Sequence, residues 1–103
     1  MKRSEVLDKA KHEVTGQRLL DYGSPENNFS MIADMWGTYL DTDIAPADVA
    51  AMMILLKVAR IGNGGGTGDC WVDIAGYAAC GGEIESIRKG DPNEREVFQK
   101  NQT

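Results

Sequence analysis

The chain has few of the side chains that most catalytic centres and structural metal sites require. Its 103 residues include one histidine, His12, and two cysteines, Cys70 and Cys80. So few residues cannot form a Cys/His zinc cluster or a convincing Ser/His/Asp or Cys/His nucleophile system. The cysteines fall on one expected helix with their Cα atoms roughly 15 Å apart, too far for a disulfide. We therefore expect two free, buried thiols and no classical hydrolase chemistry.

The sequence also lacks an excess of positive charge and any long apolar run. Its formal net charge of −5 argues against a nucleic-acid duplex as the main partner, because binding to a phosphate backbone needs a basic face. No apolar stretch is long enough to cross a bilayer. The basic N-terminus has no apolar segment behind it and does not resemble a secretory signal. These absences predict a cytoplasmic protein with no membrane partner.

What the chain does contain is helical periodicity. A length of 103 residues suits one domain, with a core small enough that pairing with another copy would stabilise it. Start signals for helices are Ser4, Ser24 with Pro25, Pro46, and Thr67. We predict an all-α, compact four-helix domain. Its helices are expected over 4–15, 25–40, 46–61 and from 68 to a stop at Gly81-Gly82, with a glycine-rich hinge before the last.

The predicted domain spans residues 1–82, and residues 83–103 are expected to be a polar C-terminal tail. The helix over 46–61 is apolar on more than one side, because Val49, Met53 and Leu56 form one stripe while Met52, Leu55 and Ala59 form another. A helix with so little polar surface is central or contacts another subunit. We therefore expect a homo-oligomer.

Four charges flank the glycine-rich hinge. Helices joined by a short connection pack antiparallel, so Arg60 should lie level with Asp69 and Lys57 with Asp73. Tyr77 extends the edge that carries both aspartates. Two interpretations stay open: interhelical salt bridges that fix the register, or a polar pocket in which the cations bind phosphate. Two carboxylates at this spacing can also share a Mg²⁺ ion, although no resident cofactor is expected.

The hinge itself, "GNGGGTG", does not have the pattern of a phosphate-binding loop. A Walker A loop ends in Gly-Lys-Ser/Thr after a strand, whereas here Gly68 is followed by Asp69 and no strand precedes the glycines. A dinucleotide fingerprint needs a βαβ unit, which is also missing. We interpret the glycines as a hinge between two helices.

Several stretches together resemble a family of small, uncharacterised phage and prophage proteins. They are "RLLDYGSPENNF", "IADMWGTYL", "DVAAMMILLKVARI" and "DCWVDIAGYAA". The shared pattern is an Arg and a Tyr-Gly before an Asn-Phe helix, then Lys-x-x-Arg, then Asp-x-x-x-Asp-x-x-x-Tyr. It covers Arg18 to Ala79. The resemblance implies a protein of an infected or lysogenic host cell.

The charged helices also resemble the nucleotide-modification-associated domains of phages and, more distantly, all-α pyrophosphohydrolases of the MazG type. MazG-type enzymes carry acidic metal ligands where this chain has Lys57 and Arg60, so no catalytic residue is carried over. What the resemblance implies is a nucleotide-like ligand, with cations for phosphate and aromatic rings for stacking. The expected ligand-binding residues are Arg18, Tyr22, Asn28, Lys57, Arg60, Asp69, Asp73 and Tyr77.

The sequence thus leads to one main hypothesis and two alternatives. The main hypothesis is a phage-type protein that binds a nucleotide or nucleotide-derived ligand and so sequesters a host defence signal. The first alternative is a Mg²⁺-dependent nucleotide pyrophosphohydrolase, although the missing catalytic set favours a binding protein over an enzyme. The second alternative is an inhibitor that blocks a host enzyme through the Met-rich helix over 46–61, with the charge pairs serving structure only.

Overall fold

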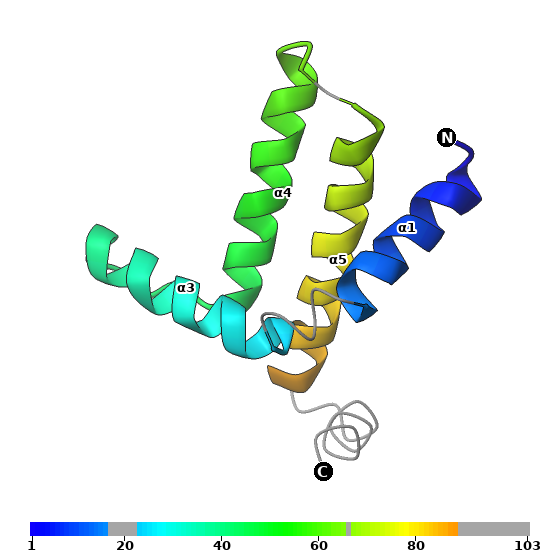
Figure 1. Ribbon diagram of the computed structural model, residues 1–103. Coiled ribbons are helices and arrows are strands. Elements are labelled where there is room, and N and C mark those ends of the chain that lie inside the picture. The colour runs from blue at the N-terminus through cyan, green and yellow to red at the C-terminus, as the bar shows by residue number, and fades with distance from the viewer. Residues whose placement is uncertain (17–22, 66, 89–103) are drawn as a thin grey trace.

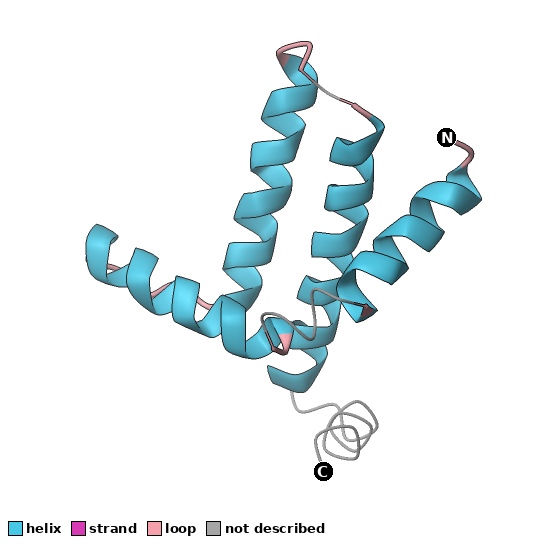
Figure 2. Ribbon diagram, in the orientation of Figure 1, coloured by secondary structure: helices cyan, strands magenta, loops and turns pink. Residues whose placement is uncertain are grey.

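The protein is all-α, as predicted. The computed structural model describes residues 1–16, 23–65 and 67–88, and within these ranges every regular element is a helix (Figure 2). None of the described helices is both long and apolar enough to cross a membrane. The four helices are α1 (Arg3–Thr15), α3 (Pro25–Leu40), α4 (Pro46–Gly62) and α5 (Gly68–Arg88).

Local sequence signals explain where two of the helices begin. The Ser24 hydroxyl caps α3 by accepting a hydrogen bond from the Asn27 backbone N–H at 3.3 Å. At the start of α4, the Asp48 carboxylate accepts a hydrogen bond from the Ala45 N–H at 2.9 Å. The expected cap at Ser4 is wrong: α1 begins one residue earlier, after Lys2, and Ser4 lies inside the helix.

The α4 and α5 helices form an antiparallel hairpin around which the other helices are arranged (Figure 1). The α1 helix packs against α5, on the side away from α4. The α3 helix crosses the base of the hairpin and extends away from it on the α4 side. This arrangement covers the lower hairpin on several sides, while the outer side of α4 has no neighbour in the view of Figure 1.

The core lies where α3 crosses the hairpin. Phe29 and Ala33 from α3 meet buried residues of both hairpin helices, and Ile32 and Trp36 pack against them half-buried. The helical spacing of the apolar residues of α3 predicts one core-facing stripe from Phe29 to Leu40. This prediction is correct up to Trp36, but Leu40 is exposed beyond the edge of the core. The hairpin's own contributions to this cluster are Val49, Ala50, Cys80 and Ile84.

The expected end of the last helix at Gly81-Gly82 is wrong. The α5 helix continues to Arg88 because two of its glycines face neighbouring helices at close range. A Cβ at Gly76 would lie 3.3 Å from Val14 of α1, and one at Gly81 would lie 3.0 Å from the Ala50 Cβ of α4. Packing therefore explains these glycines. The predicted tail beyond residue 88 lies outside the described residues, and the domain boundary at residue 82 stays a prediction.

The buried face of α5 also differs from the expected one. Helical spacing predicts an apolar stripe through Trp71, Ile74, Ala75 and Ala78, but Trp71 is exposed, while Val72 is fully buried and Cys70 and Cys80 are buried. The two cysteines are not joined by a disulfide, as predicted. The difference arises because α5 packs between α1 and α4 and so buries residues on two sides, which one periodic stripe does not describe.

Candidate functional site

One of the two predicted charge pairs forms. The Lys57 Nζ lies 3.0 Å from the Asp73 Oδ2, and the two side chains are 15% and 31% exposed. The pair joins α4 to α5 at the level that the antiparallel register predicts. Each charge is thus directly neutralised by the other in a partly desolvated position.

The second predicted pair, Arg60 with Asp69, does not form. Both side chains are exposed, and Asp69 lies 4.0 Å from Lys9 of α1 instead. Among the residues that the structure describes, Arg60 has no ion-pair partner. The reason is helical rotation. Arg60 follows Lys57 by three residues, so its side chain points about 60° away from the direction in which Lys57 faces α5. Asp69 precedes Asp73 by four residues, so its side chain points about 40° away from the direction in which Asp73 faces α4. Residues at equal height need not face each other.

Tyr77 belongs to the core rather than to an open binding surface. Its ring is half-buried and lies against Phe29, with the ring centroids 6.3 Å apart and the planes tilted by 38°. Asn28 is half-buried in the first turn of α3, where its backbone N–H donates to the Ser24 carbonyl. The two remaining predicted ligand residues, Arg18 and Tyr22, lie outside the described residues.

The structure therefore divides the predicted cluster. Lys57 and Asp73 hold each other, Tyr77 is packed against Phe29, and Arg60 is left as a solvent-facing cation one turn from Lys57. This arrangement can fix the hairpin register. Its capacity to contact an anion rests mainly on the Arg60 guanidinium, which can bind a phosphate or carboxylate through two hydrogen bonds.

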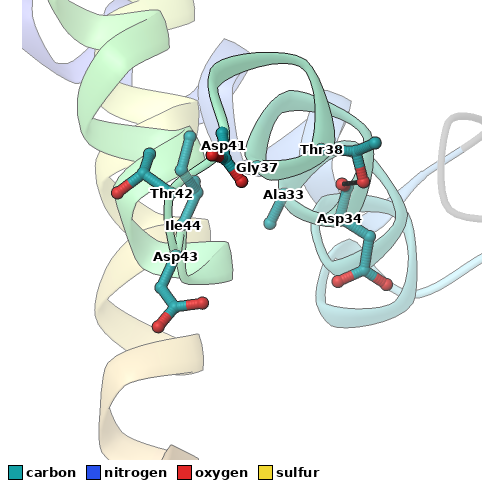
Figure 3. A pocket seen from close by; sticks show the side chains of 8 residues that line it. All are labelled: Ala33, Asp34, Gly37, Thr38, Asp41, Thr42, Asp43 and Ile44. Carbon is teal, nitrogen blue, oxygen red and sulfur yellow. Dashed lines mark hydrogen bonds between the residues drawn. The ribbon is translucent and has the colours of Figure 1, made fainter.

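An open depression of about 660 Å³ lies elsewhere, where the chain turns from α3 into α4 (Figure 3). The turn begins at Asp41, which has a left-handed backbone conformation with φ of 54°. Three aspartates line the depression, and in Figure 3 the carboxylates of Asp34 and Asp43 are separated from each other, one on α3 and the other on the turn. In the described part of the chain, no three His, Cys, Asp or Glu side chains are grouped so as to hold a metal ion. Its lining residues are Ala33, Asp34, Gly37, Thr38, Asp41, Thr42, Asp43 and Ile44.

Sequence reasoning missed a second exposed surface. Met31, Met35 and Tyr39 are 63% to 88% exposed, and their spacing of four places them on one stripe of α3, to the side of the buried Phe29 and Ala33. We call these three residues the α3 outer face. The regular spacing was visible in the sequence, but the prediction followed the stronger apolar stripe through Phe29 instead.

The α4 helix also has an exposed apolar side. Leu55 is 65% exposed, and Met52, Leu56 and Val58 are each at least 39% exposed, with the exposed Ala51 and Ala59 beside them. We call these six residues the α4 outer face. Its exposure agrees with the expectation that this helix is apolar on more than one side, and contiguous apolar patches of this kind commonly mark binding sites.

Comparison with known proteins places the chain among phage proteins. The Gene 55 protein of Mycobacterium phage D29 is 39% identical over 90 residues, which are 86% of this chain and 60% of that protein. The Gene 55 protein of Mycobacterium phage L5 is 47% identical over 74 residues, which are 71% of this chain and 47% of that protein. The chain thus spans roughly half the length of these relatives. No solved structure matches it.

A family model described as a domain of unknown function, DUF6378, matches residues 5–85. These residues include all of α3 and α4, and α1 and α5 except the start of α1 and the end of α5. The predicted resemblance to an uncharacterised phage family is confirmed at this level, whereas the likeness to MazG-type enzymes and to nucleotide-modification-associated domains stays a prediction. The chain belongs to the DUF6378 family, a family of phage proteins whose function is not assigned.

Proposed function

We propose that this protein is a small phage-type inhibitor that binds a host protein through the α3 outer face. The observation that carries the proposal is the row of Met31, Met35 and Tyr39, which lie exposed on the side of α3 turned away from its own core. Large apolar side chains repeated along one side of a helix are the anchors by which a helix binds an apolar groove of another protein. Methionine and tyrosine suit such contacts because both adapt to irregular surfaces.

The position of α3 supports this use. The helix is fixed to the hairpin through Phe29, Ala33 and Trp36, and its C-terminal end extends beyond the hairpin (Figure 1). Tyr39, near that end, is 88% exposed. An anchored helix that presents its side chains in a fixed arrangement loses little conformational entropy on binding.

The experiment is affinity capture from a mycobacterial lysate, since the relatives are mycobacteriophage proteins. The wild-type chain is compared with Met35→Glu and with Leu55→Glu, two changes at positions that are 64% and 65% exposed. We expect one host protein to be retained by the wild type and by Leu55→Glu. Its purified form should bind Met35→Glu at least about 30-fold more weakly, as expected for a central contact residue.

The two variants also provide the control for folding. Both replace a well-exposed apolar residue in a helix, so their circular dichroism spectra should match that of the wild type. If no host protein depends on Met35, or if Leu55→Glu and Met35→Glu weaken capture equally, the α3 outer face is not the binding site.

A second candidate function is the binding of a nucleotide-derived ligand that serves as a host defence signal. The observation that favours it is the exposed Arg60, one turn from the half-buried Lys57 and without an ion-pair partner among the described residues. Isothermal titration with mononucleotides, cyclic dinucleotides and ADP-ribose derivatives tests it. Binding heat that disappears in Arg60→Gln, but not in Lys9→Gln, would favour this function over the first.

The same samples test the enzyme alternative. A Mg²⁺-dependent pyrophosphohydrolase would release pyrophosphate or phosphate when incubated with each nucleoside triphosphate and Mg²⁺, whereas a binding protein would return the nucleotide intact. Release that is lost in Asp73→Asn would support an enzyme.

A further inference from the structure

The α4 outer face has the spacing of a helix that packs along another helix. Met52, Leu55, Ala59 and Gly62 continue a row that begins at Asp48, with steps of four, three, four and three residues. Alternating steps of three and four are the repeat by which two helices keep one seam in contact. All five residues of this row are exposed rather than buried against α3 or α5.

We propose that this face binds a second copy of the chain, with the two α4 helices antiparallel about a two-fold axis near Leu55 and Leu56. The proposal goes beyond the function above and does not rest on it. Its first support is shape: the large Met52 and Leu55 lie in the first half of the row, and the small Ala59 and Gly62 lie in the second half. An antiparallel arrangement sets Met52 of one copy against Ala59 of the other, so that a large side chain meets a small one on either side of the central leucines.

The second support is charge. The row carries no charge between Asp48 at its N-terminal end and Arg60 beside its C-terminal end, and Lys57 is turned inward to Asp73. In the antiparallel arrangement, Asp48 of one copy lies within about 5 Å along the helix axis of Arg60 of the other. Opposite charges then meet at both ends of the seam, whereas a parallel arrangement would bring like charges together.

The third support is the composition of the core. Among the described residues, the largest side chains that are fully buried are Val49 and Val72, and the rest of the buried set is rich in alanine and cysteine. Small domains with so little buried apolar volume commonly gain stability by oligomerisation. Pairing through α4 would bury the exposed apolar side chains of the α4 outer face.

The test is sedimentation velocity over a range of concentrations, with the 11.2 kDa chain expected at twice its mass. Leu55→Glu places two carboxylates beside the two-fold axis and should raise the dimer dissociation constant at least about 30-fold. Met35→Glu, equally exposed on α3, should leave the dimer unchanged. A monomeric wild type would overturn the proposal. A dimer that is weakened by Met35→Glu and not by Leu55→Glu would overturn it as well. Either result would mean that α4 is covered from within the chain or by another protein.

Cysteine cross-linking tests the direction of the helices. A mixture of Met52→Cys chains and Ala59→Cys chains should form disulfides between the two different variants, because these positions meet across an antiparallel seam. Within one chain the same positions lie about 10 Å apart along the helix and cannot bond. Disulfides formed only between identical variants would indicate a parallel pair and contradict the proposed arrangement. The wild type, whose Cys70 and Cys80 are buried, serves as the background control.

Discussion

Lys57 and Asp73 are charged groups at a partly desolvated position between two helices. Their 3.0 Å contact replaces the hydration that each loses, so removing one partner leaves the other without compensation. Lys9 and Asp69 lie 4.0 Å apart in an exposed position where solvent screens their attraction. The two pairs therefore allow a half-buried and an exposed ion pair to be compared within one protein.

We predict that Lys57→Met and Asp73→Asn each lower the free energy of unfolding by about 1–2 kcal/mol, between the values typical of exposed and of buried pairs. The double variant should lose less than the sum, with a coupling energy of about 1 kcal/mol. Urea unfolding of the wild type, the two single variants and the double variant measures this coupling energy. The matched cycle on Lys9 and Asp69 should give a coupling energy near zero, and equal coupling in both cycles would contradict the structural role of Lys57 and Asp73.

At the scale of single residues, the sequence predicted the level along the hairpin at which each charged residue lies, but not the direction in which its side chain points. The constant register of an antiparallel hairpin correctly paired Lys57 with Asp73. The same argument failed for Arg60 and Asp69, because helical rotation turns these two side chains by about 60° and about 40° from the directions in which Lys57 and Asp73 face each other. Phe29 against Tyr77 was also beyond prediction, since it depends on where α3 crosses the hairpin.

At the scale of helices, start signals were more informative than stop signals. Ser24-Pro25 and Pro46 mark the starts of α3 and α4 because capping and the fixed φ of proline act locally. Gly81 and Gly82 did not end α5. At Gly81, close packing against Ala50 of α4 outweighs the weak helix propensity of glycine, and Gly82 continues the same helix. Tertiary contact thus decided the length of α5, and no local pattern could have revealed it.

Replacing Gly37 of α3 and Gly82 of α5 by alanine should change the free energy of unfolding in opposite directions. A Cβ at Gly37 would lie 2.8 Å from the Thr42 carbonyl oxygen, where the chain returns along α3, whereas nothing lies within 4 Å of a Cβ at Gly82. We predict that Gly37→Ala lowers the free energy of unfolding by about 1–2 kcal/mol. Gly82→Ala should raise it by about 0.5–1 kcal/mol. Chemical denaturation measures both, and a stabilising Gly37→Ala would show that the α3–α4 turn adjusts freely.

At the scale of the whole molecule, the two exposed apolar faces are assigned different partners. The α4 outer face is complementary to itself in shape and charge, which suits a second copy. The α3 outer face consists of three uncharged side chains, Met31, Met35 and Tyr39, on a helix that extends away from the hairpin. This arrangement suits binding to a groove on another protein. Periodicity alone predicted the fold class and the apolar sides of α4, but only the packing of α3 shows which of its sides stays exposed.

The measurement that tests this account most directly is light scattering coupled to size-exclusion chromatography, with the captured host protein added to each variant. We predict that Met35→Glu remains a dimer and loses the host protein, while Leu55→Glu becomes a monomer and keeps it. A variant that loses both dimer formation and binding of the host protein would contradict the proposal that α3 binds the target while α4 binds a second copy. Binding of the host protein by both variants would also contradict it.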